Sequence, residues 1–117
     1  MPFVRTPIFV TRTPWDKVPE VTLFVDTWRD HIVKGHVQMA DKQPQVQFVA
    51  SSPTLILSGT SNPSHVIFVN ETVTTASGAP LAVVINPDER IVVTAYYNRS
   101  LKIISPDQVI WSLLETK

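Results

Sequence analysis

Two of the three histidines in this chain lie close together, as His31 and His36 of the segment HIVKGH. Histidine is the side chain whose unperturbed pKa is nearest to neutral pH, so two histidines near one helix end are candidates for general acid–base catalysis. On a regular helix, side chains five residues apart point about 140° away from each other, which argues against a helical two-histidine metal site. The rings converge only if Gly35 ends the helix and His36 turns back. Otherwise His31 is a helix-face residue and His36 a polar terminus.

The segment VVTAYYNR, residues 92–99, holds a second set of groups suited to chemistry. Successive side chains of a strand point to opposite faces, so Thr94 and Tyr96 are expected to share one face. With Arg99 just beyond the strand, they would supply hydroxyl donors and a fixed cation, the groups that hold a phosphate and stabilise its transition state. Threonine and tyrosine are also common in strands for packing reasons alone.

Further polar residues could contact a substrate. Ser58 opens the loop SGTSNPS, whose hydroxyls and backbone N–H groups, including those of Thr60 and Ser61, could face an anion. An ordinary polar loop between strands is the alternative. Lys34 lies between the two histidines and could add positive charge, or it could be a solvated lysine on the helix surface. The G-x-S-x-G turn that carries the nucleophile of many hydrolases does not occur in the sequence.

The elements that would position these residues begin with strands and helices. Residues 3–11 are rich in β-branched and aromatic side chains, but Pro7 cannot donate to a ladder, so an edge strand or an arm is predicted. A second extended run covers residues 18–25. A helix is predicted over residues 28–38, preceded by Thr27, which forms a capping box with Asp30. Pro44 fits the first turn of a second helix, over residues 44–51.

From residue 54 onward the apolar pattern changes to alternation and short apolar runs, joined by SGAP and NPDE turns. The predicted strands cover residues 54–57, 65–75, 81–86 and 90–97. Residues 105–117 are predicted as a C-terminal helix or tail, and residues 1–20 as an N-terminal strand or arm. The predicted fold is one α+β domain over residues 1–117. It has an antiparallel meander sheet of about four strands, with one or two N-terminal helices packed on one face.

Composition excludes several classes of protein. The chain has 117 residues, with 10 Lys and Arg against 10 Asp and Glu, and it has no Cys. Disulfide scaffolds, thiolate nucleophiles and Cys-ligated metals are therefore ruled out. A formal net charge of zero is unlike the basic surface of a high-affinity duplex binder. The apolar runs are far shorter than the ~20 residues that span a bilayer. We expect a soluble, cytoplasmic protein with no membrane partner, no metal and no cofactor.

The order of these segments resembles the barnase–EndoU–colicin–RelE (BECR) group of phage- and bacterial-encoded domains. That group shows a strand, a helix with W-x-x-H-I-x-x-x-H, a second helix leading to a P-x-x-I-x-x-S stretch, and antiparallel strands of which the last ends in V-x-T-A-Y. The resemblance covers about residues 21–99. The matching positions are Trp28, His31, Ile32 and His36 in the helix, Pro53, Ile56 and Gly59 in the middle stretch, and Val92 or Val93 with Thr94, Ala95 and Tyr96 in the last strand.

The resemblance implies a metal-independent ribonuclease of the toxin-like kind, in which a ribose 2′-hydroxyl attacks the adjacent phosphate. It implies acid–base roles for His31 and His36, and phosphate contacts for Thr94 and Tyr96. Lys34, Ser58 and Arg99 are the further predicted substrate-binding residues. RNA is the implied partner, and an antitoxin or immunity protein would be a second one that the sequence does not identify.

The alternative hypothesis is a catalytically inactive module of the same fold that serves binding or assembly, for instance as a homo-oligomer. Its motivation is the neutral charge together with apolar residues near both ends of the chain, namely Phe3, Phe9, Trp15, Trp111 and Leu113. A small-ligand pocket between helix and sheet is a third hypothesis, and no specific residue favours it.

Overall fold

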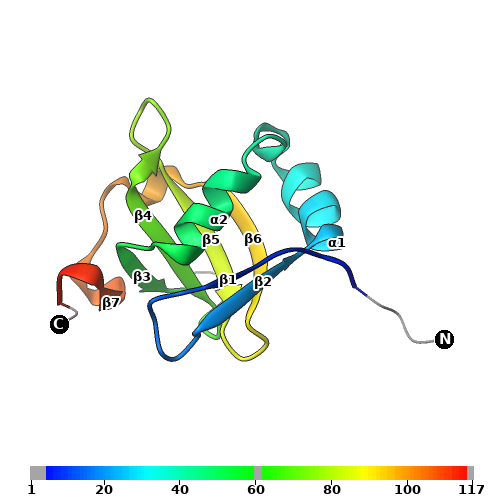
Figure 1. Ribbon diagram of the computed structural model, residues 1–117. Helices are drawn as coiled ribbons and strands as arrows, with labels where there is room; N and C mark the ends of the chain where they lie inside the picture. The colour runs from blue at the N-terminus through cyan, green and yellow to red at the C-terminus, as the bar shows by residue number, and fades with distance from the viewer. Residues whose placement is uncertain (1–4, 60–61, 116–117) are drawn as a thin grey trace.

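The computed structural model describes residues 5–59 and 62–115. Within them, one mixed sheet of seven strands has the order β1-β2-β6-β5-β4-β3-β7 (Figure 1). Neighbouring strands are antiparallel except β2 and β6, which run parallel and pair at Thr22 and Ile91. The strands are β1 (Pro7–Arg12), β2 (Glu20–Phe24), β3 (Leu55–Ser58), β4 (Val66–Thr74), β5 (Pro80–Asn86), β6 (Ile91–Tyr97) and β7 (Val109–Ser112).

The helical segments are short. Among the described residues, no helix is both long enough and apolar enough to cross a membrane. The segments are α1 (Val25–Thr27), the π-helical η1 (Trp28–Val33), α2 (Gln43–Ser51) and the 3₁₀ turns η2 (Val37–Met39), η3 (Arg99–Lys102), η4 (Pro106–Gln108) and η5 (Leu113–Glu115).

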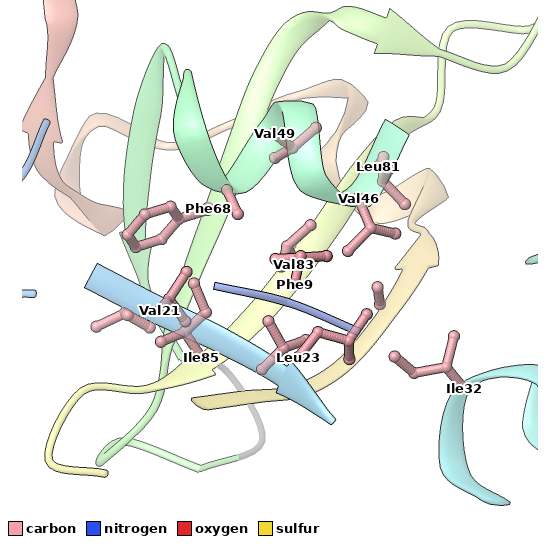
Figure 2. Close-up of a cluster of buried hydrophobic side chains, with 14 of the residues drawn as sticks. Phe9, Val21, Leu23, Ile32, Val46, Val49, Phe68, Leu81, Val83 and Ile85 are labelled. Carbon is pink, nitrogen blue, oxygen red and sulfur yellow. The ribbon is translucent and has the colours of Figure 1, made fainter. Parts of the chain in front are cut away.

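The main core lies between α2 and the sheet. Pro44 lies in the first turn of α2, as predicted, and Val46, Val49 and Ala50 are fully buried on one side of the helix. This spacing of three and four residues is the apolar stripe of a helix that packs on a sheet. Figure 2 shows Val46 and Val49 above Val83 of β5, with Phe9 of β1 in the same cluster.

The sheet bends around this core. The helix α2 contacts β1 as well as β4 and β5, although β2 and β6 separate β1 from β5 in the sheet order. Val21 and Leu23 of β2 therefore join the same buried cluster as Phe68 of β4 (Figure 2). The bend brings the β1–β2 hairpin over the helix-bearing face and closes the core from that side.

The opposite face of the sheet carries a second apolar cluster. Leu57, Ile67, Val69 and Ala82 are buried there with Leu101, which comes from the segment that follows β6. This covering explains why residues 81–85 read as one uninterrupted apolar run, since a strand buried on both faces has no polar side to alternate with. We call this surface, away from α2, the outer face.

The predicted four-stranded antiparallel meander is wrong. The sheet has seven strands and one parallel pair, because β1, β2 and β7 join the run β3 to β6. Local patterns identify extended segments but do not show which distant segment each one pairs with. β1 does lie at the edge of the sheet, where Pro7 needs no ladder partner for a missing N–H.

Two local predictions also differ from the structure. Thr27 makes no capping bond, because α1 begins after Phe24 and Thr27 is already helical. In place of the expected C-terminal helix over residues 105–117, β7 pairs with β3, flanked by the short turns η4 and η5. The four residues of β7 have an apolar pattern that fits either a helix or a strand. They form a strand because the edge of β3 would otherwise have unpaired backbone groups. Residues 116–117 lie outside the described residues.

The apolar residues that motivated the assembly hypothesis have mixed surroundings. Phe9 and Trp15 are 8% and 7% exposed and belong to the core, so they are unavailable to a partner. Trp111 is half-buried against the core and Leu113 is exposed. Phe3 lies outside the described residues.

Candidate functional site

Thr94 and Tyr96 lie on the outer face of β6. Thr94 pairs with Val84 and Tyr96 with Ala82 on the neighbouring strand β5. Directly opposed residues of paired strands share a face, and Ala82 is buried in the outer cluster. The register shifts just before this pair, leaving Val93 as an extra residue of β6. Such a bulge turns the neighbouring side chains and is frequent beside functional sites.

His36 contacts Tyr96, although the two residues lie far apart in the sequence. Its backbone leaves the helical region (φ −140°, ψ 82°) directly after Gly35, and its N–H donates to the carbonyl of Ile32 over 2.8 Å. The imidazole then stacks on the Tyr96 ring, with 4.9 Å between the ring centroids and 17° between the planes. The helix end therefore does turn His36 back, as its use in a site requires.

A cleft of about 270 Å³ opens beside Tyr96 on the outer face. Its lining includes the apolar side chains of Ile67, Val84 and Val93 and the hydroxyl-bearing Thr94 and Tyr96. The segment between β3 and β4 adds Gly59, Asn62 and His65. We call these eight residues, together with the stacked His36, the histidine–tyrosine cleft.

His65 was missed in the sequence as a site residue. It is half-buried directly before β4, and its sequence neighbours make it look like part of that strand. Its position at the end of a polar loop could have identified it, because functional side chains often lie on loops. The structure thus brings His65 to the same cleft as Thr94 and Tyr96, from about thirty residues away in the chain.

Four polar side chains of the cleft take no part in the hydrogen bonds of the fold, whereas Asn62 accepts from the N–H and the hydroxyl of Ser64. The imidazoles of His36 and His65 and the hydroxyls of Thr94 and Tyr96 have no hydrogen-bond partner among the described residues. By contrast, buried Asn70 donates to the Ser52 carbonyl over 2.6 Å and accepts from Thr72. Structural polar side chains are normally bonded in this way. Unused donors and acceptors gathered around one hollow are available to a ligand.

Gly59 is needed for the shape of the cleft. Its N–H donates to the His65 carbonyl, and the His65 N–H donates to the Asn62 carbonyl, both over 3.0 Å. A Cβ at position 59 would lie 2.2 Å from the Asn62 carbonyl oxygen and 2.7 Å from that of His65. Both contacts are with backbone, so the loop itself would have to move.

We expect Gly59→Ala to lower the free energy of unfolding by about 1–3 kcal/mol and to displace His65, because a methyl group must force the loop open. Gly35→Ala is the matched control, since nothing lies within 4 Å of its added Cβ and its φ is not positive. Alanine there should stabilise the helix by up to about 1 kcal/mol. Urea denaturation of both variants measures the difference, and equal stabilities would contradict the assigned role of Gly59.

His36 reaches the cleft only through its stack on Tyr96, and the predicted site residues other than Thr94 and Tyr96 lie outside the lining as well. His31 is exposed on η1, and Lys34 is exposed one turn later. Ser58 ends β3 and is exposed, and Arg99 is exposed on η3. Thr60 and Ser61, which were expected to face an anion, lie outside the described residues.

Two charged side chains near His31, Arg29 and Asp30, form an ion pair with each other. Arg29 donates to both carboxylate oxygens of Asp30, over 2.9 and 3.1 Å. This hydrogen bond holds the pKa of the Asp30 carboxyl below its ordinary value and raises that of Arg29. Across residues 5–59 and 62–115, no group of three His, Asp or Glu side chains is arranged to hold a metal ion.

Comparison of the chain with protein-family models, with curated proteins and with solved structures gave no match. A function for this chain therefore has to be inferred from the geometry of the cleft.

Proposed function

We propose that the histidine–tyrosine cleft binds single-stranded RNA and cleaves it by metal-independent phosphodiester transfer. The observation that carries the proposal is the stack of His36 on Tyr96, because the Tyr96 ring lines a hollow that is also lined by His65 and Thr94. Two imidazoles and two hydroxyls with no structural partner are the group types that this reaction uses.

The proposed reaction needs one proton acceptor and one proton donor. One imidazole takes the proton of a ribose 2′-hydroxyl as its oxygen attacks the adjacent phosphorus. The bond between phosphorus and the 5′-oxygen breaks, and the second imidazole gives its proton to that oxygen. The products are a 2′,3′-cyclic phosphate and a free 5′-hydroxyl. In this scheme His36 and His65 are the acid–base pair, and His65 takes the role that the sequence suggested for His31.

The hydroxyls have a separate role. Negative charge grows on the non-bridging phosphate oxygens as the 2′-oxygen attacks. Donors that already face this position stabilise the charge without having to reorganise. Thr94 and Tyr96 are suited to it because they lie two residues apart on a rigid central strand. Arg99 follows the same strand and Lys34 precedes His36 by two residues, so both are proposed to attract the RNA backbone.

The direct test is product analysis with purified protein, a labelled single-stranded RNA and a metal chelator. We expect cleavage with the chelator present, a 2′,3′-cyclic phosphate end, and no cleavage of the same sequence as DNA or with 2′-O-methyl groups. Both replacements remove the attacking hydroxyl and leave the phosphates in place. Cleavage of the DNA at a similar rate, or no cleavage of RNA at all, would refute the proposal.

A further inference from the structure

A second, larger hollow lies on the same outer face. It encloses about 570 Å³ between β3, β4 and the segment that carries η3 and η4. Its lining combines apolar side chains, among them Leu55, Val69, Ile104 and Val109, with the polar side chains of Glu71, Thr74, Lys102 and Ser112. We call this hollow the strap groove, because residues 98–108 run from the end of β6 to the start of β7 as a strap (Figure 1).

One row of laterally paired residues across the sheet leads from the cleft to the groove. Tyr96 pairs with Ala82, Ala82 with Val69, and Val69 with Leu55. Tyr96 lines the cleft, whereas Val69 and Leu55 line the groove. Strands are about 4.8 Å apart, so Tyr96 and Val69 are separated by about 10 Å. Ala82 between them is buried in the cluster that includes Leu101 of η3.

The turn η3 lies where the two hollows approach each other, since Leu101 lines the groove and packs in the same cluster as Ala82. We call its two exposed cations, Arg99 and Lys102, the ridge. Leu101 is 4% exposed and packs into the outer cluster, whereas Arg99 and Lys102 are exposed. In a 3₁₀ helix, residues three apart lie on the same side, about 6 Å apart along the axis. Arg99 and Lys102 have this spacing, and neither forms a salt bridge among the described residues.

We infer that the ridge of Arg99 and Lys102 carries the phosphates of a substrate strand from the histidine–tyrosine cleft toward the strap groove. This inference rests on the proposed function and narrows its substrate to a single-stranded RNA longer than a dinucleotide. Two unpaired cations in line attract successive phosphates. The apolar side chains of the groove, such as Ile104 and Val109, then contact the base that follows and shield part of it from water.

The charge of Glu71 agrees with phosphates that lie beside η3 and a base that lies in the groove. Its carboxylate accepts a hydrogen bond from the Thr54 hydroxyl over 3.1 Å, so it is held in place at the groove. Glu71 repels a phosphate, whereas Lys102, which also lines the groove, attracts one at η3. The phosphates are therefore expected beside η3 and away from Glu71.

The test is binding of fluorescein-labelled, 2′-O-methylated RNA, which cannot be cleaved, at about 50 to 200 mM NaCl. We expect a hexanucleotide to bind tighter than a dinucleotide. In the variant Arg99→Ala/Lys102→Ala, the slope of log affinity against log salt should fall in magnitude by about 0.7 for each cation removed. Arg12→Ala/Lys17→Ala is the matched control, because it removes two exposed cations from the β1–β2 hairpin and should keep the slope.

The outcomes separate this inference from the proposed function. An unchanged slope in Arg99→Ala/Lys102→Ala overturns the inference even if the protein cleaves RNA, and so does a hexanucleotide that binds no tighter than a dinucleotide. A ridge-dependent slope in a protein that cleaves no RNA supports the inference and refutes the nuclease. Equal losses in the two double variants overturn the inference as well, because they indicate binding by overall charge alone.

Discussion

His36→Phe is expected to reduce RNA cleavage by about 10²–10⁴-fold, the usual contribution of one positioned acid or base. Phenylalanine can keep the stack on Tyr96, so the variant removes the two ring nitrogens and little else. The free energy of unfolding should therefore stay close to that of the parent. Initial rates of RNA cleavage and a urea denaturation curve, measured on the same preparation, check both parts.

His65→Ala and His31→Ala decide which histidine is the partner of His36. We expect His65→Ala to lose activity to a similar extent, because His65 lines the cleft. His31 is exposed on η1 outside that lining, so its loss should cost far less. If His31→Ala is inactive and His65→Ala is not, the pairing inferred from the sequence resemblance is right and the pairing inferred from the cleft is wrong.

Tyr96→Phe separates the hydroxyl of Tyr96 from its ring. The variant keeps the aromatic partner of His36 and removes one donor from the cleft. Loss of a single donor to a transition-state oxyanion lowers kcat by about 10²–10³-fold in known cases. An effect on KM with kcat unchanged would instead assign Tyr96 to binding.

The largest effect on stability is expected from Phe68→Ala, at about 3–5 kcal/mol. Phe68 is fully buried on β4 and meets Trp15 edge-to-face, with 6.2 Å between ring centroids. Removing it leaves a cavity where the β1–β2 hairpin closes over the sheet. Because small domains have a total stability of about 5–15 kcal/mol, a large share would be lost. Urea denaturation, with the midpoint and slope compared between variants, measures this loss.

Phe48→Ala is the matched control for this change. Phe48 is 46% exposed on α2, whereas Val46 and Val49 of the same helix are fully buried. Its replacement should cost below about 1 kcal/mol, since exposed positions lose little burial and alanine favours helix. Similar losses for Phe48→Ala and Phe68→Ala would contradict the packing described for this core.

Several elements were predictable because their causes are local. Pro44 and the apolar spacing after it indicated α2, and Pro7 indicated an edge strand. The strand period of two indicated that Thr94 and Tyr96 share a face, and both line one cleft. Each of these features depends on residues within one or two turns of backbone.

The sheet itself was not predictable in the same way. The parallel contact of β2 with β6 joins Thr22 to Ile91, and β7 pairs with β3 across about fifty residues of chain. Such pairings are selected by the burial of the whole core and not by either strand alone. For this reason the number of strands in the sheet and its one parallel pair were not predicted.

By itself, the sequence determined that Thr94 and Tyr96 lie on one strand face, because backbone geometry alone sets that alternation. Only the tertiary structure decided that His36 stacks on Tyr96 and that His65, not His31, lines the same hollow. The physical reason is distance along the chain. Contacts between the end of η1, the β3–β4 loop and β6 exist only once the bent sheet has formed around α2.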